Sequence, residues 1–293
     1  MEAVIAIGFL TLLASGLGVV LAIANSRLKI FEDPRIDAVQ DMLPGSNCGA
    51  CGLPGCRLFA EEAVAGHVQP SDCRVGGQET ATEVAEYLGV EAGSREKEVA
   101  RLLCAGGSNV AIQMAEYVGY PSCQSASAVS GGSKGCRYGC LGFGDCMLVC
   151  DFDAIHMSPT GLPVVDADKC TSCGDCVEIC PKNLFVLRPI SQHLLVQCKS
   201  ELEGDEILKL CKVACTACGK CVADAPQGLL QMKNNLPQLN DELLQLQEPD
   251  AIKRCASGAI VWIEEQQFPE FQNNSNNSVK TTNNVVQEKT SIS

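Results

Sequence analysis

Aromatic residues make up only 4% of this 293-residue chain, and histidine occurs just three times. Basic residues are also few, because 22 Lys and Arg stand against 35 Asp and Glu, for a net charge of -13 at pH 7. A protein that binds nucleic acid needs a basic face to neutralise phosphates. This charge balance therefore excludes nucleic acid as a partner. Because histidine is scarce, any metal in this protein must be bound by cysteine thiolates.

The sequence motifs of nucleotide binding are missing as well. No G-x-G-x-x-G opens a helix, because the pair Gly142 and Gly144 lacks a third glycine, and no G-x-x-x-x-G-K-[ST] occurs. The histidines at 67, 156 and 193 are isolated, and no nucleophile is paired with a base. We therefore expect no catalytic residue and no hydride-transfer site on this chain, which leaves one-electron chemistry.

The amino terminus predicts a membrane anchor over residues 1–26. Residues 3–24 are all uncharged, and as a helix they would measure roughly 33 Å, enough to cross a hydrocarbon core of about 30 Å. A signal peptide would have a basic start and a shorter apolar stretch, so we favour an uncleaved single span. Arg27, Lys29 and Arg35 follow the span and no basic residue precedes it. The positive-inside rule then places the rest of the chain on the cytoplasmic side of the inner membrane.

Cysteine is the abundant residue, with 20 copies. The reducing cytoplasm disfavours disulfides, so these thiols are expected to bind metal. Cys170, Cys173, Cys176 and Cys180 follow the bacterial ferredoxin spacing, with Pro181 after the last. In that run three cysteines hold one [4Fe-4S] cluster and the fourth ligates the other cluster.

The second half of such a ferredoxin lies upstream, in CRYGCLGFGDCMLVC at residues 136–150. Exchanging the fourth ligands between the halves predicts two clusters. One would be held by Cys136, Cys140, Cys146 and Cys180, and the other by Cys150, Cys170, Cys173 and Cys176.

The cysteine pattern then repeats further along the chain, at one constant offset in residue number. Cys140, Cys146 and Cys180 correspond to Cys215, Cys221 and Cys255, whereas the four ligands of the other cluster have no cysteine counterparts. We therefore expect a degenerate module with one cluster, held by Cys215, Cys218, Cys221 and Cys255. Cys211 corresponds to Cys136, so it could replace Cys218.

A different pattern stands near the amino terminus. Cys48, Cys51 and Cys56 lie among four glycines, and Cys73 follows. Glycines let backbone amides approach sulfur closely, so these four cysteines predict a further [4Fe-4S] cluster. The alternative is a zinc knuckle, which three such closely spaced cysteines disfavour.

A span followed by NCGACGLPGC and a two-cluster ferredoxin resembles the B subunit of the Rnf electron-transport complex, called RsxB in some bacteria. The resemblance covers about residues 1–265. It implies an ion-translocating oxidoreductase with other membrane and cytoplasmic subunits, which passes electrons between soluble reduced ferredoxin and NAD while moving Na+ or H+. This chain lacks the last cysteine triad found in the long form of the family.

Four cysteines remain outside these sets: Cys104, Cys123, Cys198 and Cys211. They could hold one more cluster, although their spacing follows no common motif, or they could be buried thiols that pack as small apolar groups. The expected number of [4Fe-4S] clusters is therefore at least three and at most five.

The expected fold class is α+β, with ferredoxin-like β-α-β modules. The expected units are an anchor (1–26), an amino-terminal 4Fe-4S domain (32–91), a helical connection (92–133), a two-cluster module (134–190), a one-cluster module (191–266) and a disordered tail (267–293). Two functions fit this organisation. One is electron transfer within a membrane ion pump, and the other is a membrane-tethered reductase that keeps an iron-sulfur transcription factor reduced.

Overall fold

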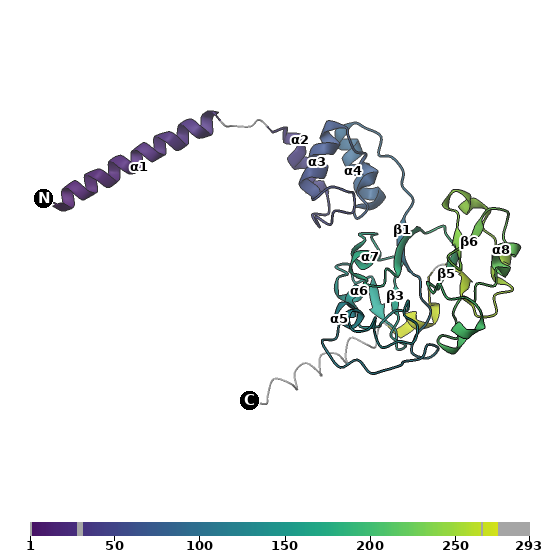
Figure 1. The fold of residues 1–293 in the computed structure, drawn as a ribbon. Coiled ribbons are helices and arrows are strands. Elements are labelled where there is room, and N and C mark those ends of the chain that lie inside the picture. The colour runs from purple at the N-terminus through teal and green to yellow at the C-terminus, as the bar shows by residue number, and fades with distance from the viewer. Residues whose placement is uncertain (1, 28–31, 265, 275–293) are drawn as a thin grey trace.

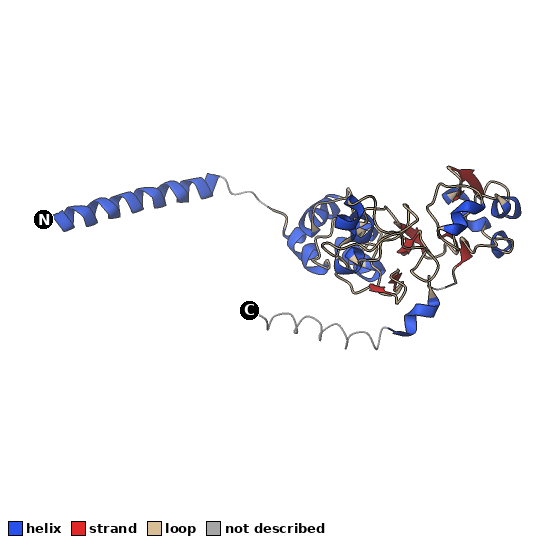
Figure 2. Cartoon of the chain, turned by 60° about the horizontal axis from the view of Figure 1, so that its bottom comes forward, coloured by secondary structure: helices blue, strands red, loops and turns tan. Residues whose placement is uncertain are grey.

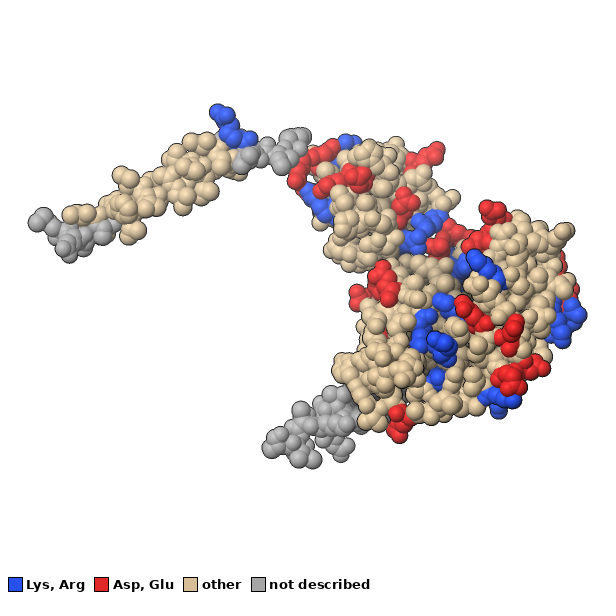
Figure 3. All heavy atoms as spheres, viewed as in Figure 1, with Lys and Arg blue, Asp and Glu red and all other residues tan. Residues whose placement is uncertain are grey.

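The computed structural model describes residues 2–27, 32–264 and 266–274. Helix α1 (Glu2–Arg27) stands apart from the rest of the described chain (Figure 1). Its segment Ile7–Asn25 has a mean hydropathy of 2.3, and none of it is buried. In Figure 3 a basic side chain stands at the Arg27 end of this helix. By length and composition, α1 can cross a membrane.

A helical domain follows, built from α2 (Pro34–Met42), α3 (Cys56–Ala65), the 3-10 turn η1 (Pro70–Asp72) and α4 (Gly77–Leu88). The Asp33 side chain caps α2 by accepting the Arg35 N–H, and Pro34 takes the first helical position. Helix α3 is followed by Gly66, whose φ of 79° lies in the left-handed region that glycine adopts without a steric penalty. The three helices close over a small core that includes Val39, Phe59 and Val84.

The rest of the described chain forms two modules of short strands (Figures 1 and 2). In the first, β1 (Glu98–Leu102) pairs antiparallel with β4 (Phe185–Pro189), with Ala100 opposite Leu187. Between them in sequence, β2 (Ile155–Met157) and β3 (Pro163–Val165) form an antiparallel pair. Short helices α5 (Cys123–Ala128), α6 (Asp145–Leu148) and α7 (Asp175–Ile179) complete this module.

The second module repeats this pairing. Its outer strands β5 (Leu194–Val196) and β8 (Ile260–Trp262) are antiparallel, as are the inner strands β6 (Leu230–Lys233) and β7 (Leu236–Leu239). Helix α8 (Lys220–Asp224) lies among the 3-10 turns η2 (Asp205–Lys209), η3 (Asp241–Leu246) and η4 (Pro249–Ile252). The starts of α8, β6 and β8 follow those of α6, β2 and β4 by the offset that separates Cys215 from Cys140. The offset found among the cysteines therefore also holds for the elements that carry them.

The first module starts earlier than the boundary expected at residue 134. Its outer strand β1 comes from residues 98–102, inside the segment expected to be a helical connection. Residues 103–135 form an insertion after that strand and contain only the short helix α5. β4 needs an antiparallel partner to satisfy its backbone groups, and β1 provides it although the two strands are far apart in sequence.

The tail also starts later than the expected boundary at residue 267. Gln267 and Phe268 are buried, and the 3-10 turn η5 (Pro269–Asn274) follows them. The Gln267 amide donates to the Leu102 carbonyl (2.7 Å) and accepts from the Leu102 N–H (2.9 Å). Its side chain thus satisfies the free edge of β1 as a further strand would. The remainder of the expected tail, residues 275–293, lies outside the described residues.

Replacing Gln267 with Ala should therefore destabilise the first module. It leaves the buried N–H and C=O of Leu102 without partners, at a cost of about 2–3 kcal/mol in the free energy of unfolding. Urea denaturation checks this, with Gln231→Ala on an exposed strand position as the control. Equal midpoints for the two variants would show that Gln267 does not stabilise β1.

Candidate metal centres

In the amino-terminal domain, four cysteines line one hollow: Cys48, Cys51, Cys56 and Cys73. The loop before α3 is shaped by Asn47, which has a φ of 49° and whose Oδ1 accepts the N–H of Cys56 at 2.9 Å. A Cβ at Gly55 would stand 3.0 Å from that same oxygen, so a larger residue here would press on the Asn47 side chain. These are the four cysteines that the sequence predicted to act together.

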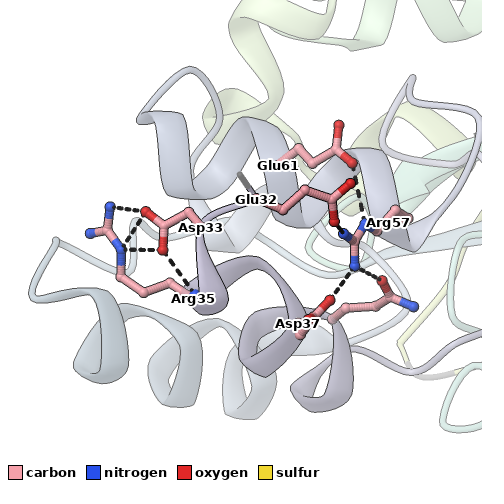
Figure 4. Close-up of polar contacts among 7 residues, drawn as sticks. Glu32, Asp33, Arg35, Asp37, Arg57 and Glu61 are labelled. Carbon is pink, nitrogen blue, oxygen red and sulfur yellow. Dashed lines mark hydrogen bonds and ion pairs between the residues drawn. The ribbon is translucent and has the colours of Figure 1, made fainter. Parts of the chain in front are cut away.

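Arg57, the residue after Cys56, ties this site to the neighbouring helix (Figure 4). Its guanidinium pairs with Glu32 and Asp37, donates to Gln40 Oε1 (3.1 Å) and pairs with Glu61 on its own helix (3.2 Å). The hydrogen bond to Asp37 is the main cause that raises the Arg57 pKa. This cluster of charges joins α2 to α3 directly beside a cysteine of the set.

In the first module, Cys150, Cys170 and Cys173 lie close enough to Cys176 for their charges to act on its thiol. Burial, followed by the thiolate charges of the three other members, raises the pKa of Cys176 to about 12. Burial likewise raises the pKa of Cys173 to about 11. Such thiols stay protonated at neutral pH unless a metal takes the place of the proton.

The other set of the first module differs from the sequence prediction. Cys140, Cys146 and Cys180 line one hollow as expected, but the fourth cysteine on it is Cys123 and not Cys136. Burial raises the pKa of Cys140 to about 12, and the charge of Cys123 is among the causes that raise the pKa of Cys146.

Asp145 holds Cys123 at this hollow. Asp145 is only 9% exposed, and its carboxylate accepts the N–H groups of Cys123 (2.9 Å) and Gln124 (3.2 Å). The Gln124 side chain donates in turn to the carbonyl of Ile179, the residue before Cys180 (3.1 Å). These hydrogen bonds hold the start of α5, which lies in the insertion, next to Cys146 and Cys180.

The sequence does hold a signal for Cys123. In the second module the local run is Cys215, Cys218 and Cys221, and the residue of the first module that corresponds to Cys218 is Phe143. The first module thus lacks the middle cysteine of its local run, and Cys123 supplies a sulfur from elsewhere. The comparison of Phe143 with Cys218 is therefore the sequence signal that this set draws a sulfur from outside its local run.

In the second module, Cys215, Cys218, Cys221 and Cys255 line one hollow. Burial raises the pKa of Cys221 to about 11, with smaller contributions from the charges of the other three. Cys211 does not line this hollow. Of the two alternatives left open by the sequence, the geometry favours Cys218.

The remaining cysteines also meet. Cys104, Cys136, Cys198 and Cys211 line a single hollow between the two modules. Cys136 and Cys211 are buried, and burial raises the pKa of Cys211 to about 11. Three of the four cysteines left over in the sequence analysis therefore line this hollow, and the fourth is Cys136 instead of Cys123.

The donor chemistry of these hollows fits [4Fe-4S] clusters, since each presents four sulfurs. Among the described residues, no three Cys, His, Asp or Glu side chains converge on one metal-ion position.

Basic side chains lie beside two of the sets, although acidic residues outnumber basic ones in the chain. The Lys134 ammonium lines the hollow between the modules and donates to the Gly106 carbonyl (2.6 Å). Lys182, next to Cys180 in sequence, donates to the Gly131 carbonyl (2.7 Å), and burial lowers its pKa. Both amines offset the negative charge of nearby thiolates.

Comparison with known proteins agrees with this donor chemistry. The Fe-S cluster family model matches residues 43–75, and the 4Fe-4S binding domain model matches residues 162–185. Over 255 residues the chain is 45% identical to the B subunit of the Na(+)-translocating ferredoxin:NAD(+) oxidoreductase complex of Acetobacterium woodii, covering 87% of this chain and 76% of the relative. The chain belongs to the family of B subunits of ion-translocating oxidoreductase complexes.

Two other members of this family match most of this chain and most of their own length. The B subunit of the proton-translocating ferredoxin:NAD(+) oxidoreductase complex of Clostridium ljungdahlii is 36% identical over 86% of this chain and 89% of its own. The B subunit of the ion-translocating oxidoreductase complex of Methanosarcina acetivorans is 37% identical over 78% of this chain and 87% of its own. The resemblance noted from the sequence motifs is thus confirmed over most of the chain.

Replacing Asp145 with Ala should release Cys123 from its set. The change removes two charge-assisted hydrogen bonds, each contributing about 1.5–3 kcal/mol, and frees α5. Hydrogen exchange at the Cys123 and Gln124 amides should accelerate at least about 10-fold. The exposed Asp151→Ala is the control, and unchanged exchange at both amides would contradict this role for Asp145.

Proposed function

We propose that this protein carries electrons between soluble reduced ferredoxin and the NAD-reducing part of an ion-translocating membrane complex. The relatives named above are subunits of ferredoxin:NAD(+) oxidoreductase complexes that translocate Na+ or protons. The observation that carries the proposal is the arrangement of four-cysteine sets in a body joined to a helix long enough to span a membrane. A bound [4Fe-4S] cluster supplies one-electron transfer.

The cysteines we assign as ligands form four sets. They are Cys48, Cys51, Cys56 and Cys73; Cys150, Cys170, Cys173 and Cys176; Cys123, Cys140, Cys146 and Cys180; and Cys215, Cys218, Cys221 and Cys255. The strand pairing supports two ferredoxin-like modules, because in each one the outer strands pair with each other and the inner strands form a second pair.

Contacts between neighbouring sets support an ordered row of centres. Cys73 of the amino-terminal set and Cys170 of the first module line one cavity, and Arg74 pairs with Glu98 beside it (2.8 Å). Within the first module, the charge of Cys176 contributes to the raised pKa of Cys146. These contacts support an arrangement in which the amino-terminal set and both sets of the first module lie close together.

This function predicts the metal content and the electron donor. Full-length protein purified anaerobically should contain iron and acid-labile sulfide in equal amounts, at least about 16 of each per chain. Reduced ferredoxin should bleach the brown absorbance, whereas oxidised ferredoxin, the control, should not. Stoichiometric zinc without sulfide, or clusters that reduced ferredoxin leaves oxidised, would contradict the proposal.

The proposed membrane arrangement is a single span by α1, with the cysteine-bearing body on the cytoplasmic side of the inner membrane. The basic residues Arg27 and Arg35, which follow the apolar segment, support this orientation.

A reporter enzyme fused after Ser293 tests that orientation. A reporter that works only in the periplasm should be inactive, and one that works only in the cytoplasm should be active. The reverse pair of results would overturn the orientation and would return disulfides to consideration for the twenty thiols.

A further inference from the structure

The hollow between the two modules is lined by four cysteines that come from four separate segments: Cys104, Cys136, Cys198 and Cys211. No local spacing joins them. Cys104 follows β1, Cys198 follows β5, and the other two lie in loops that precede the local cysteine runs. The strand pairing of both modules is needed to bring them together.

Each module contributes an equivalent pair of cysteines. Cys104 and Cys198 are both the second residue after the first strand of their module. Their sulfurs accept equivalent hydrogen bonds, from the Cys140 N–H to Cys104 Sγ and from the Cys215 N–H to Cys198 Sγ, both at 3.4 Å. Cys136 and Cys211 are separated by the offset of the repeat, the same that separates Cys140 from Cys215. Two unrelated buried thiols would have no reason to recur in this way.

Backbone contacts across the module junction hold the two pairs face to face. The Ala105 N–H, beside Cys104, donates to the Gln197 carbonyl, beside Cys198 (3.1 Å). On the other side, Ala111 forms a β-bridge with Cys211, and the Lys212 N–H donates to the Val110 carbonyl (3.0 Å). The insertion that follows β1 therefore closes over the hollow.

Space at the hollow is kept free by Gly106. A Cβ at this position would stand 3.0 Å from Cys211 Sγ and 3.7 Å from Cys104 Sγ. The Gly106 carbonyl accepts from the Lys134 ammonium (2.6 Å), which puts a positive charge beside the sulfurs. Cys104, Cys136 and Cys211 are all buried, so a charged cofactor here would be shielded from water and balanced by Lys134.

We propose that Cys104, Cys136, Cys198 and Cys211 together ligate a fifth [4Fe-4S] cluster at the junction of the two modules. The same assignment gives Cys123, and not Cys136, to the set with Cys140, Cys146 and Cys180. The hydrogen bonds from Cys140 and Cys215 place this junction site directly between a set of the first module and the set of the second. The proposal rests on the proposed function, because it requires that the chain bind iron-sulfur clusters at all.

The decisive experiment measures iron and acid-labile sulfide in anaerobically purified full-length protein with paired Cys→Ala substitutions. Wild type should contain about 20 iron atoms per chain, since five clusters hold four each. Cys104→Ala with Cys198→Ala, one from each module, should lose only about 4 iron atoms because both ligate one cluster. The matched control, Cys104→Ala with Cys218→Ala, should lose about 8.

A second group of pairs tests the exchange of Cys136 and Cys123. Cys136→Ala with Cys180→Ala should lose two clusters, and Cys123→Ala with Cys180→Ala should lose one. The opposite result would restore the ligand sets expected from the sequence spacing and overturn this assignment. Wild type with about 16 iron atoms, unchanged by Cys104→Ala with Cys198→Ala, would show that these cysteines are buried thiols. Wild type without iron would instead refute the proposed function.

Gly106→Ala provides a variant that keeps every cysteine. Its methyl group would press on Cys211 Sγ, so it should lower the iron content by about 4 atoms while the electron paramagnetic resonance signals of the other four clusters remain. These signals also show whether each cysteine variant has folded. Full iron content in Gly106→Ala, with all five signals present, would contradict a cluster at this position.

Discussion

The structure depends on the need to bring four sulfurs around each buried cofactor. With so few aromatic residues, the cores are small and made of aliphatic side chains and the cysteines themselves, as in the first module, where Val99, Leu102 and Leu184 pack beside Cys140 and Cys176. Burial raises the pKa of most of these thiols, so their deprotonation is favourable only when a metal takes up the charge. Cofactor binding and folding are therefore coupled.

Strand pairing provides the frame for this arrangement. The antiparallel pairs β1 with β4 and β5 with β8 close each module and set the positions of Cys104 and Cys198 just beyond their first strands. Gln267 extends the first of these pairs by bonding both backbone groups of Leu102. The insertion at 103–135 brings Cys123 to one hollow, and its residues Gly106 and Ala111 line another.

The repeat shows how a two-cluster module can be divided. The second module has no cysteines at the positions that correspond to Cys150, Cys170, Cys173 and Cys176, but it has a complete local run at Cys215, Cys218 and Cys221. The first keeps both of its sets, with Phe143 where the middle cysteine would stand and Cys123 supplied through Asp145. At the junction the two modules present equivalent sulfurs, since Cys104 Sγ accepts the Cys140 N–H and Cys198 Sγ accepts the Cys215 N–H.

The sequence by itself indicated the apolar span, the iron-sulfur chemistry and the family, and it grouped the cysteines that line the amino-terminal hollow and the hollow of the second module. This was possible because short Cys-x2-Cys spacings constrain local turns, and because length and polarity govern membrane spanning. Tertiary structure alone decided the partners of Cys104, Cys123, Cys136, Cys198 and Cys211, as well as the position of β1. These residues meet only through strand pairs and side-chain contacts between distant segments, such as Asp145 with α5, and no local pattern encodes such long-range pairing.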